Sequence, residues 1–253
     1  MKKSMYVAFS NQKGGVGKSA FTTLVASSLH YAGGKNVAVF DCDYPQYSIY
    51  AMRERDKSFV MANDHLKELL ALQFEQTGKK AYPVIPVKPE DALDAAQQYL
   101  TKAETDFDVV FFDLSGTVSG TGILKSMLNL DYIFCPVTSD RLVMQSTLTF
   151  ASFIKDCVAK YPEVPLKGLY LFWNQLVKSE NREVYDAYCT IIDQLKLDIL
   201  KTEIPFTIKY KREMSRSSKQ VFRSTLFPPT KSLIKGTCLE NLIEEICQII
   251  ELK

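Results

Sequence analysis

Residues 10–19 read SNQKGGVGKS, and no other stretch of the chain constrains its structure as strongly. The short apolar run 6–9 comes before this stretch, and residues 19–31 follow it with the apolar spacing and residue types of a helix. Glycines let successive backbone N–H groups turn toward one phosphate, and the start of a helix adds a positive dipole end. The sequence therefore predicts a strand, a phosphate-binding loop and a helix in direct succession.

Backbone and side chains have different predicted tasks in this loop. Lys18 is expected to reach the β- and γ-phosphates of a nucleotide, and the Ser19 hydroxyl to bind the Mg²⁺ that accompanies them. A chance glycine-rich turn is the alternative, and it would have to produce the whole pattern by accident. The residues expected to surround the nucleotide phosphates are Gly14, Gly15, Val16, Gly17, Lys18, Ser19 and Ala20.

The loop departs from the general pattern G-x-x-x-x-G-K-[ST] at its first position, where Gln12 stands, and Lys13 follows it. In this form it resembles the deviant Walker A motif of the ParA/MinD superfamily of ATPases. The resemblance implies ATP and Mg²⁺ as cofactors, and a homodimer in which Lys13 reaches the phosphates held by the other subunit. A second ammonium group there would offset negative charge that develops during γ-phosphoryl transfer.

Acidic side chains follow two apolar runs. Residues 41–46 read DCDYPQ, and alternate spacing places Asp41 and Asp43 on one side of an extended chain. This segment resembles the family's Asp-x-Asp-Pro-Gln element, with Tyr44 as an extra residue, and Asp113 resembles a Walker B aspartate. The resemblance implies that Asp43 orients the attacking water, that Asp41 supports the magnesium shell, and that Asp113 holds the metal, usually through water.

Two later positions resemble the family's adenine contacts. Asn174 follows the apolar run 169–173, and Pro205 with Phe206 follows a later strand-like segment. An asparagine after a strand is also a common turn former, so a turn at Asn174 is the alternative.

Short apolar runs alternate with helix-like segments along the chain. Because the runs are continuous, they fit strands covered on both faces, as in a parallel sheet. We predict an α/β fold of the P-loop NTPase type: a doubly wound, mostly parallel sheet with helices on both faces, in three layers and a single domain spanning residues 1–253. The predicted strands are 6–9, 37–40, 84–87, 109–112, 132–137 and 169–173, and the predicted helices are 19–31, 64–76, 90–102, 142–161 and 182–195.

Composition agrees with a folded, water-soluble protein, since 46% of residues are apolar and 24% are charged. The six cysteines form no C-x-x-C pair and only two histidines are present, which argues against a zinc site. The chain shows no signal peptide and no run of 18 apolar residues, so we expect a cytoplasmic protein without a membrane span. The amphipathic segment 239–252 has an acidic polar face, which favours docking on the sheet over binding a membrane surface.

Basic residues gather late in the chain. Residues 206–236 contain eight Lys or Arg and one acid, and such a tract can neutralise DNA phosphates without reading the base sequence. A solvated basic face without a partner is the alternative. Within the tract 209–235, the candidate DNA contacts are Lys209, Lys211, Arg212, Arg216, Lys219 and Arg223.

Residues 136–141 and the Tyr-Pro-Gln variant are similar to the TraA proteins of conjugative transposons. The combined prediction is an ATPase of low intrinsic turnover that dimerises on ATP and Mg²⁺. It would serve DNA partition or conjugative transfer and respond to a ParB-like or other activating protein. The alternatives are a membrane-cycling regulator similar to MinD, and a P-loop ligase or kinase whose acceptor pocket Ser115, Thr117 and Arg141 could line.

Overall fold

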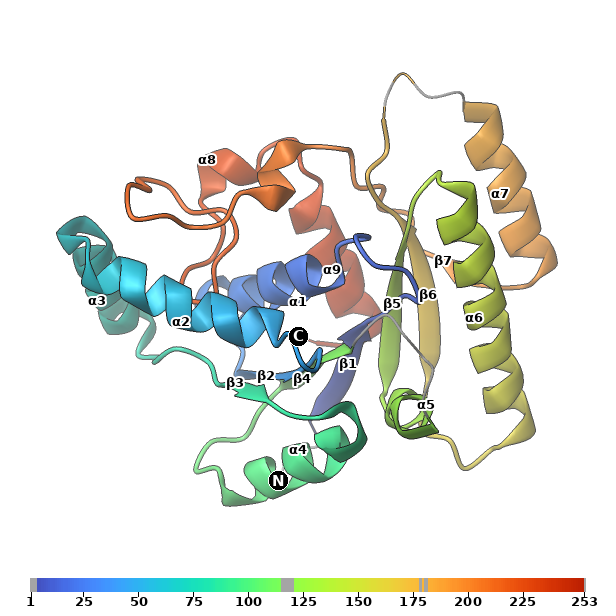
Figure 1. Ribbon diagram of the computed structural model, residues 1–253, viewed down its shortest axis with the longest axis horizontal. Coiled ribbons are helices and arrows are strands. Elements are labelled where there is room, and N and C mark those ends of the chain that lie inside the picture. Colours follow the sequence, from blue (N-terminus) through green and yellow to red (C-terminus); the bar gives the residue numbers. More distant parts are fainter. Residues whose placement is uncertain (1–3, 115–120, 178, 180–181, 253) are drawn as a thin grey trace.

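The computed structural model of the protein describes residues 4–114, 121–177, 179 and 182–252 (Figure 1). The described part forms a seven-stranded sheet in the order β3-β2-β4-β1-β5-β6-β7, and neighbouring strands pair in parallel. This confirms the predicted doubly wound parallel sheet. The strands are β1 (Met5–Phe9), β2 (Val37–Cys42), β3 (Val84–Pro86), β4 (Val109–Leu114), β5 (Tyr132–Val137), β6 (Gly168–Trp173) and β7 (Asp198–Ile199).

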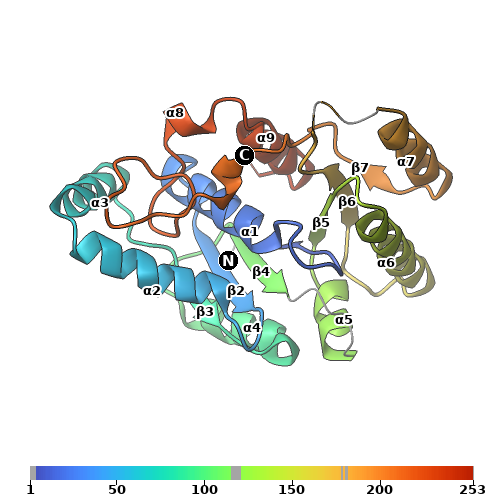
Figure 2. The ribbon, with the colours of Figure 1, turned by 45° about the horizontal axis from the view of Figure 1, so that its top comes forward.

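Helices cover both faces of the sheet, and Figure 2 shows the resulting three layers. Helix α3 (Asp64–Thr77) packs beside α2 (Ser48–Met61), and the short α8 (Lys231–Ile234) lies near α1 (Lys18–Ser27). One face packs against α1 (Lys18–Ser27), α2 (Ser48–Met61) and α9 (Leu239–Ile249). The opposite face packs against α4 (Ala92–Lys102), α5 (Thr121–Leu128), α6 (Arg141–Lys160) and α7 (Arg182–Gln194).

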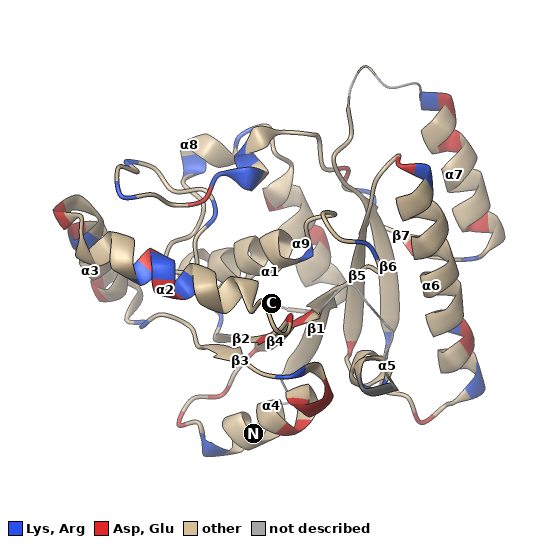
Figure 3. Ribbon diagram, in the orientation of Figure 1, with Lys and Arg blue, Asp and Glu red and all other residues tan. Residues whose placement is uncertain are grey.

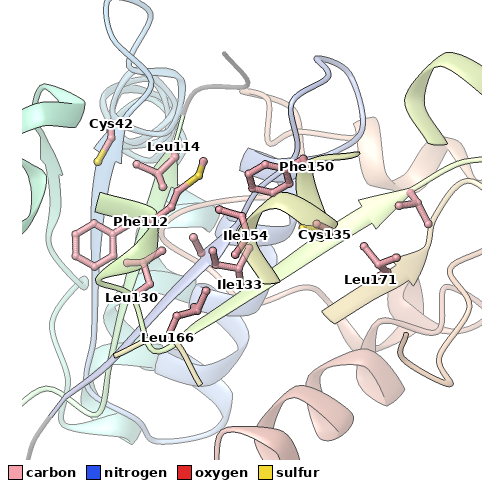
Figure 4. Packing of buried hydrophobic residues seen from close by; sticks show 14 of the residues in the cluster. Cys42, Phe112, Leu114, Leu130, Ile133, Cys135, Phe150, Ile154, Leu166 and Leu171 are labelled. Carbon is pink, nitrogen blue, oxygen red and sulfur yellow. The ribbon is translucent and has the colours of Figure 1, made fainter. Parts of the chain in front are cut away.

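Alternate side chains of each strand enter different cores, because successive residues of a strand point to opposite faces. On one face, Phe9 of β1 stacks on Phe21 of α1 with ring centroids 5.9 Å apart. Figure 4 shows the opposite core, where Phe112 and Ile133 of the sheet pack with Phe150 of α6. Both cores are fully covered, which explains why the strands read as continuous apolar runs.

The order of strands places the candidate site. Strand β1 lies between β4 and β5, and the order of strands continues outward in opposite directions from this point. The loop that follows β1 therefore begins at the topological switch point of the sheet. Ligands of such sheets bind in the crevice outside the strand ends at this switch point. Strand β2 pairs with β4 in a register that sets Asp41 opposite Asp113. The loop 10–19 and both carboxylates therefore meet at one edge of the sheet.

The structure confirms the predicted strands and helices within a few residues, and it adds helices α2, α5 and α8, which the sequence analysis did not predict, and places the strand-like segment before Pro205 at β7. Helix α2 could not be predicted from an apolar pattern because charged residues interrupt its buried face. That face contains Arg53 and Asp56 as well as Ile49, Met52 and Val60. The predicted C-terminal helix docks on the sheet as α9.

Among the described residues, no helix combines the length and apolarity that crossing a bilayer requires.

Candidate functional site

The loop after β1 turns on two glycines in left-handed backbone conformation, Gly15 (φ 76°) and Gly17 (φ 96°). A side chain is strained at such φ values, and a Cβ on Gly17 would also lie 3.1 Å from Cε2 of Phe21. Gly17 directly precedes α1 and no side chain caps its N-terminus. The first N–H groups of α1 are therefore left to an anion at the loop.

Asn11 holds the start of this loop against the neighbouring strand and helix. Its Nδ2 donates to the Pro136 carbonyl and to Thr147 Oγ1, both at 2.8 Å. Its Oδ1 accepts the backbone N–H of Lys13 at 2.9 Å. Asn11 is buried, so these bonds are shielded from water and fix the path of the loop before the glycines.

The two lysines of the loop have different surroundings. Lys18 Nζ donates to the Lys13 carbonyl at 3.0 Å, so the side chain folds back across the loop. Burial lowers the pKa of Lys18, while the carboxylates of Asp113 and Asp43 oppose that shift. The Lys13 side chain instead points into solvent and makes no ion pair with a described residue. Lys18 thus serves this chain's own loop, whereas Lys13 is free to reach outward.

The two carboxylates at the ends of β2 and β4 are not equivalent. Both oxygens of Asp113 are buried without a hydrogen-bond partner among the described residues. Burial, with smaller contributions from Asp41 and Asp43, raises the pKa of Asp113 to about 7, although the Ser19 hydroxyl and the Lys18 ammonium oppose the rise. An unpartnered buried carboxylate next to a hydroxyl is a donor set that Mg²⁺ accepts. The arrangement therefore fits the predicted metal position.

Asp41 has partners of its own. Its Oδ2 accepts the backbone N–H of Tyr50 at 2.8 Å and its Oδ1 accepts that of Asp43 at 3.2 Å. Burial raises the pKa of Asp41, and these backbone hydrogen bonds oppose the shift. Asp41 therefore holds the segment 43–50 and the first turn of α2 beside the loop, where Ser48 Oγ lies 3.4 Å from Ser19 Oγ.

The extra residue Tyr44 does not move its neighbours away from the loop. The peptide bond between Tyr44 and Pro45 is cis, and the turn closes with the Tyr47 N–H donating to the Asp43 carbonyl at 2.8 Å. Tyr44 itself is exposed, with Lys88 Nζ 5.7 Å from its ring centroid. Asp43 and Gln46 consequently face the same cavity as Lys18.

A cavity of about 490 Å³ opens over the loop, which is the size of a small-molecule or cofactor site. It extends from the turn after β2 to the segments that follow β6 and β7. The residues that line it are Gly14, Gly15, Gly17, Lys18, Ser19, Ala20, Phe21, Asp43, Gln46, Leu114, Asn174, Gln175, Pro205, Phe206, Thr207, Tyr210, Lys211 and Arg223.

The predicted adenine positions form one wall of this cavity. Asn174 Nδ2 donates to the Val16 carbonyl at 2.9 Å, and its Oδ1 accepts the Gln175 N–H at 2.8 Å. Asn174 therefore braces the phosphate loop in this structure, and base reading by it stays a prediction. Pro205 pairs with Leu176, which places Phe206 at the cavity edge with 52% of its surface exposed.

The basic tract does not form one uniform face. Figure 3 shows Lys and Arg along the segment between β7 and α8. Arg212, Arg216 and Lys219 are exposed, whereas Lys209 Nζ is tied to the Lys235 carbonyl at 2.8 Å. The remaining two candidates, Lys211 and Arg223, line the cavity.

Sequence patterns did not reveal the part of the cavity wall formed by Thr207, Tyr210 and Gln175, because these residues lie in loops and in the short 3-10 helix Ile208–Lys211, which have no apolar periodicity. Tyr210 was detectable only as an aromatic residue inside the basic tract. Of the residues suggested for an acceptor pocket, Arg141 does not line the cavity, and Ser115 and Thr117 lie outside the described residues.

Comparison with known proteins agrees with this geometry. The chain matches the CbiA family, described as the CobQ/CobB/MinD/ParA nucleotide binding domain, over residues 7–221. No curated protein sequence matches it.

Solved structures share the fold at low sequence identity. A putative plasmid partition protein from Borrelia burgdorferi B31 bound to AMPPNP has a TM-score of 0.61 and 17% identity, over 98% of this chain and 100% of that one. The MinD cell division protein of Aquifex aeolicus has a TM-score of 0.59 and 14% identity, over 99% and 98%. Cobyrinic acid a,c-diamide synthase from Mycobacterium smegmatis with a bound ATP analog and magnesium has a TM-score of 0.56 and 21% identity, over 81% and 86%. At these identities the likeness shows the fold alone.

The family match covers most of the chain and includes the glycine loop, the paired strand-end carboxylates and every residue that lines the cavity except Arg223. The chain belongs to the CobQ/CobB/MinD/ParA family of nucleotide-binding domains, with the ParA/MinD fold.

Proposed function

We propose that this chain is an ATPase that binds ATP with Mg²⁺, dimerises in that state and hydrolyses the nucleotide slowly. The observation that carries the proposal is the glycine loop with Lys18 beside two carboxylates set opposite each other on β2 and β4. AMPPNP in the partition protein and an ATP analog with magnesium in the cobyrinic acid a,c-diamide synthase support ATP and Mg²⁺ as ligands.

The residues have distinct tasks in this proposal. Backbone N–H groups of residues 14–20 and the Lys18 ammonium would bind the phosphates, with Ser19 and Asp113 holding Mg²⁺ and Asp41 fixing the adjoining turn. Bound Mg²⁺ supplies positive charge that neutralises the β- and γ-phosphate oxygens. Asp43 lies on the cavity wall near Lys18, where its carboxylate can orient a water molecule toward the γ-phosphate.

The exposed Lys13 supports a dimer in which the ammonium of one subunit reaches phosphates in the other. Replacing Asp43 with alanine removes the water-orienting carboxylate but leaves the phosphate contacts. We therefore expect Asp43→Ala to accumulate as a dimer with ATP and Mg²⁺, with a turnover at least about 100-fold below wild type. Size-exclusion chromatography with light scattering, run in saturating ATP, measures the mass.

The matched control is the double variant Asp43→Ala with Lys13→Ala, which we expect to bind nucleotide and stay monomeric. A monomeric Asp43→Ala protein at nucleotide saturation would contradict the cross-subunit role of Lys13. A dimer that persists after loss of Lys13 would contradict it equally.

We further propose that the ATP-bound dimer binds DNA without sequence preference through the exposed part of the basic tract. Arg216 and Lys219 lie on an exposed loop beside the N-terminus of α3, where Asn63 Nδ2 donates to the Arg216 carbonyl at 2.7 Å. Each exposed cation can displace counterions from the DNA backbone, so the affinity falls steeply with salt.

Replacing Arg216 and Lys219 together by alanine should weaken DNA binding and lower the slope of log affinity against log salt by about two. Gel shifts over a salt series, with ATP and with a non-hydrolysable analogue, measure this slope. A double replacement of the exposed Lys102 and Lys160, which lie on α4 and α6, is the control and should leave it unchanged. If neither nucleotide state of wild type shifts DNA, the DNA proposal is wrong while the ATPase proposal stands.

A role in DNA partition is supported by the likeness to plasmid partition proteins, and a role in conjugative transfer by the TraA-like residues 136–141. We propose that such a role includes an activating protein of the ParB kind. Turnover measured with and without DNA and candidate activators tests this.

A further inference from the structure

Two side chains of the basic tract, Lys211 and Arg223, lie on the wall of the nucleotide cavity. Tyr210, which directly precedes Lys211, fixes this wall to the first turn of α1, because its ring centroid lies 5.5 Å from that of Phe21. Tyr210 also donates its hydroxyl to the Thr237 carbonyl at 2.8 Å. The wall therefore keeps its position relative to the phosphate loop.

Backbone pairing fixes the position of Arg223. Its N–H donates to the Arg212 carbonyl at 3.2 Å, and its carbonyl accepts from Met214 at 3.3 Å. The Arg223 side chain is 16% exposed, which is far less than a DNA contact on an open surface requires. Because Arg223 also lines the cavity, a ligand bound there can reach its side chain.

Arg223 and Lys211 differ in whether an acidic side chain is paired with them. Glu213 binds Arg223 Nη2 at 2.5 Å with one oxygen and Arg55 of α2 with the other. The Lys211 ammonium makes no hydrogen bond or ion pair with a described residue, and it is exposed. This wall consequently carries a net positive charge and faces a cavity that ends at the glycine loop.

We propose that Lys211 and Arg223 contact the bound nucleotide, at the ribose and α-phosphate beyond the first turn of α1, and do not serve DNA. This inference rests on the proposed nucleotide site and divides the basic tract by function. Arg212, Arg216 and Lys219 remain for DNA on the outside, whereas Lys211 and Arg223 bind the nucleotide inside. One continuous segment of the chain would then contact the nucleotide and DNA.

The test compares single variants in calorimetric titrations with Mg-ATP and no DNA. Lys211→Ala should raise the dissociation constant about tenfold, the lower end of the loss expected for a charge-assisted contact because Lys211 is exposed, and Lys211→Arg should restore most of it. Arg223→Ala should raise the constant by a similar factor. Arg216→Ala comes from the same tract, and Arg55→Ala removes the other ion pair of Glu213, so both should bind Mg-ATP like wild type.

Thermal unfolding of each variant without nucleotide separates a lost contact from a lost fold. If Lys211→Ala and Arg223→Ala bind Mg-ATP as tightly as wild type but lose DNA binding as Arg216→Ala does, the inference is wrong and the ATPase proposal stands. If wild type itself does not bind Mg-ATP, the proposed function fails first.

Discussion

Replacing Lys18 by alanine should weaken binding of Mg-ATP about 100-fold and stop measurable hydrolysis. The side chain is the one ammonium that folds across the described loop, and its partner there is only the Lys13 carbonyl. A charge-assisted contact to phosphate contributes about 3 kcal/mol, which corresponds to a factor near 100. Calorimetric titration and phosphate release measure the two effects.

Lys13→Ala is the matched control, because it removes a lysine from the same loop that points into solvent. We expect it to bind Mg-ATP within about threefold of wild type, since its proposed phosphate contact needs a second subunit. Hydrolysis should fall in both variants. Equal affinity of wild type and Lys18→Ala for Mg-ATP would show that the loop is not the phosphate site.

Asp56→Ala should destabilise the protein by about 3 kcal/mol, because it leaves buried donors without an acceptor. Asp56 Oδ2 accepts hydrogen bonds from Ser224 Oγ at 2.9 Å and from the Thr225 N–H at 2.7 Å. Thr225 is held from the other side by Arg53 Nε at 2.9 Å. The midpoint of thermal unfolding should fall by about 10 °C.

Arg55→Ala is the control for this stability effect, since Arg55 sits on the same helix with its side chain 43% exposed. A surface ion pair contributes less than about 1 kcal/mol, so the unfolding midpoint should move by only a few degrees. A decrease equal to that of Asp56→Ala would show that the buried network adds no stability of its own.

The sequence determined the phosphate loop well because its requirements are local. Glycines with positive φ, a strand before them and a helix after them all lie within residues 5–27, and the structure contains each one. The roles proposed for Lys18 and Ser19 rest on that local geometry. The fold class followed from continuous apolar runs, which require covers on both faces of a sheet.

Long-range placement could not be read from the sequence in the same way. The two aspartates Asp41 and Asp113 are separated by a long stretch of chain, and only strand pairing shows that they stand opposite each other. That Asp41 binds backbone N–H groups while Asp113 has free oxygens depends on the three-dimensional path of the turn.

The positions of charged residues in the sequence did not show which of them are exposed and which are buried or line the cavity. The basic tract reads as one surface along the chain, yet Lys211 and Arg223 face the cavity. Helix α2 lacks a continuous apolar face in the sequence because Arg53 and Asp56 lie on its buried side. Arg53 and Asp56 are both held by hydrogen bonds with Thr225, which is distant from them in sequence.

A calorimetric titration of the wild-type chain with ATP, in the presence and absence of Mg²⁺, tests whether the cavity over residues 14–20 binds a nucleotide. We expect saturable binding of one nucleotide per chain, with a dissociation constant between about 1 μM and 1 mM and a marked loss of affinity when Mg²⁺ is chelated. Absence of any binding to ATP with Mg²⁺ would contradict the assignment of the cavity over residues 14–20 as a nucleotide site.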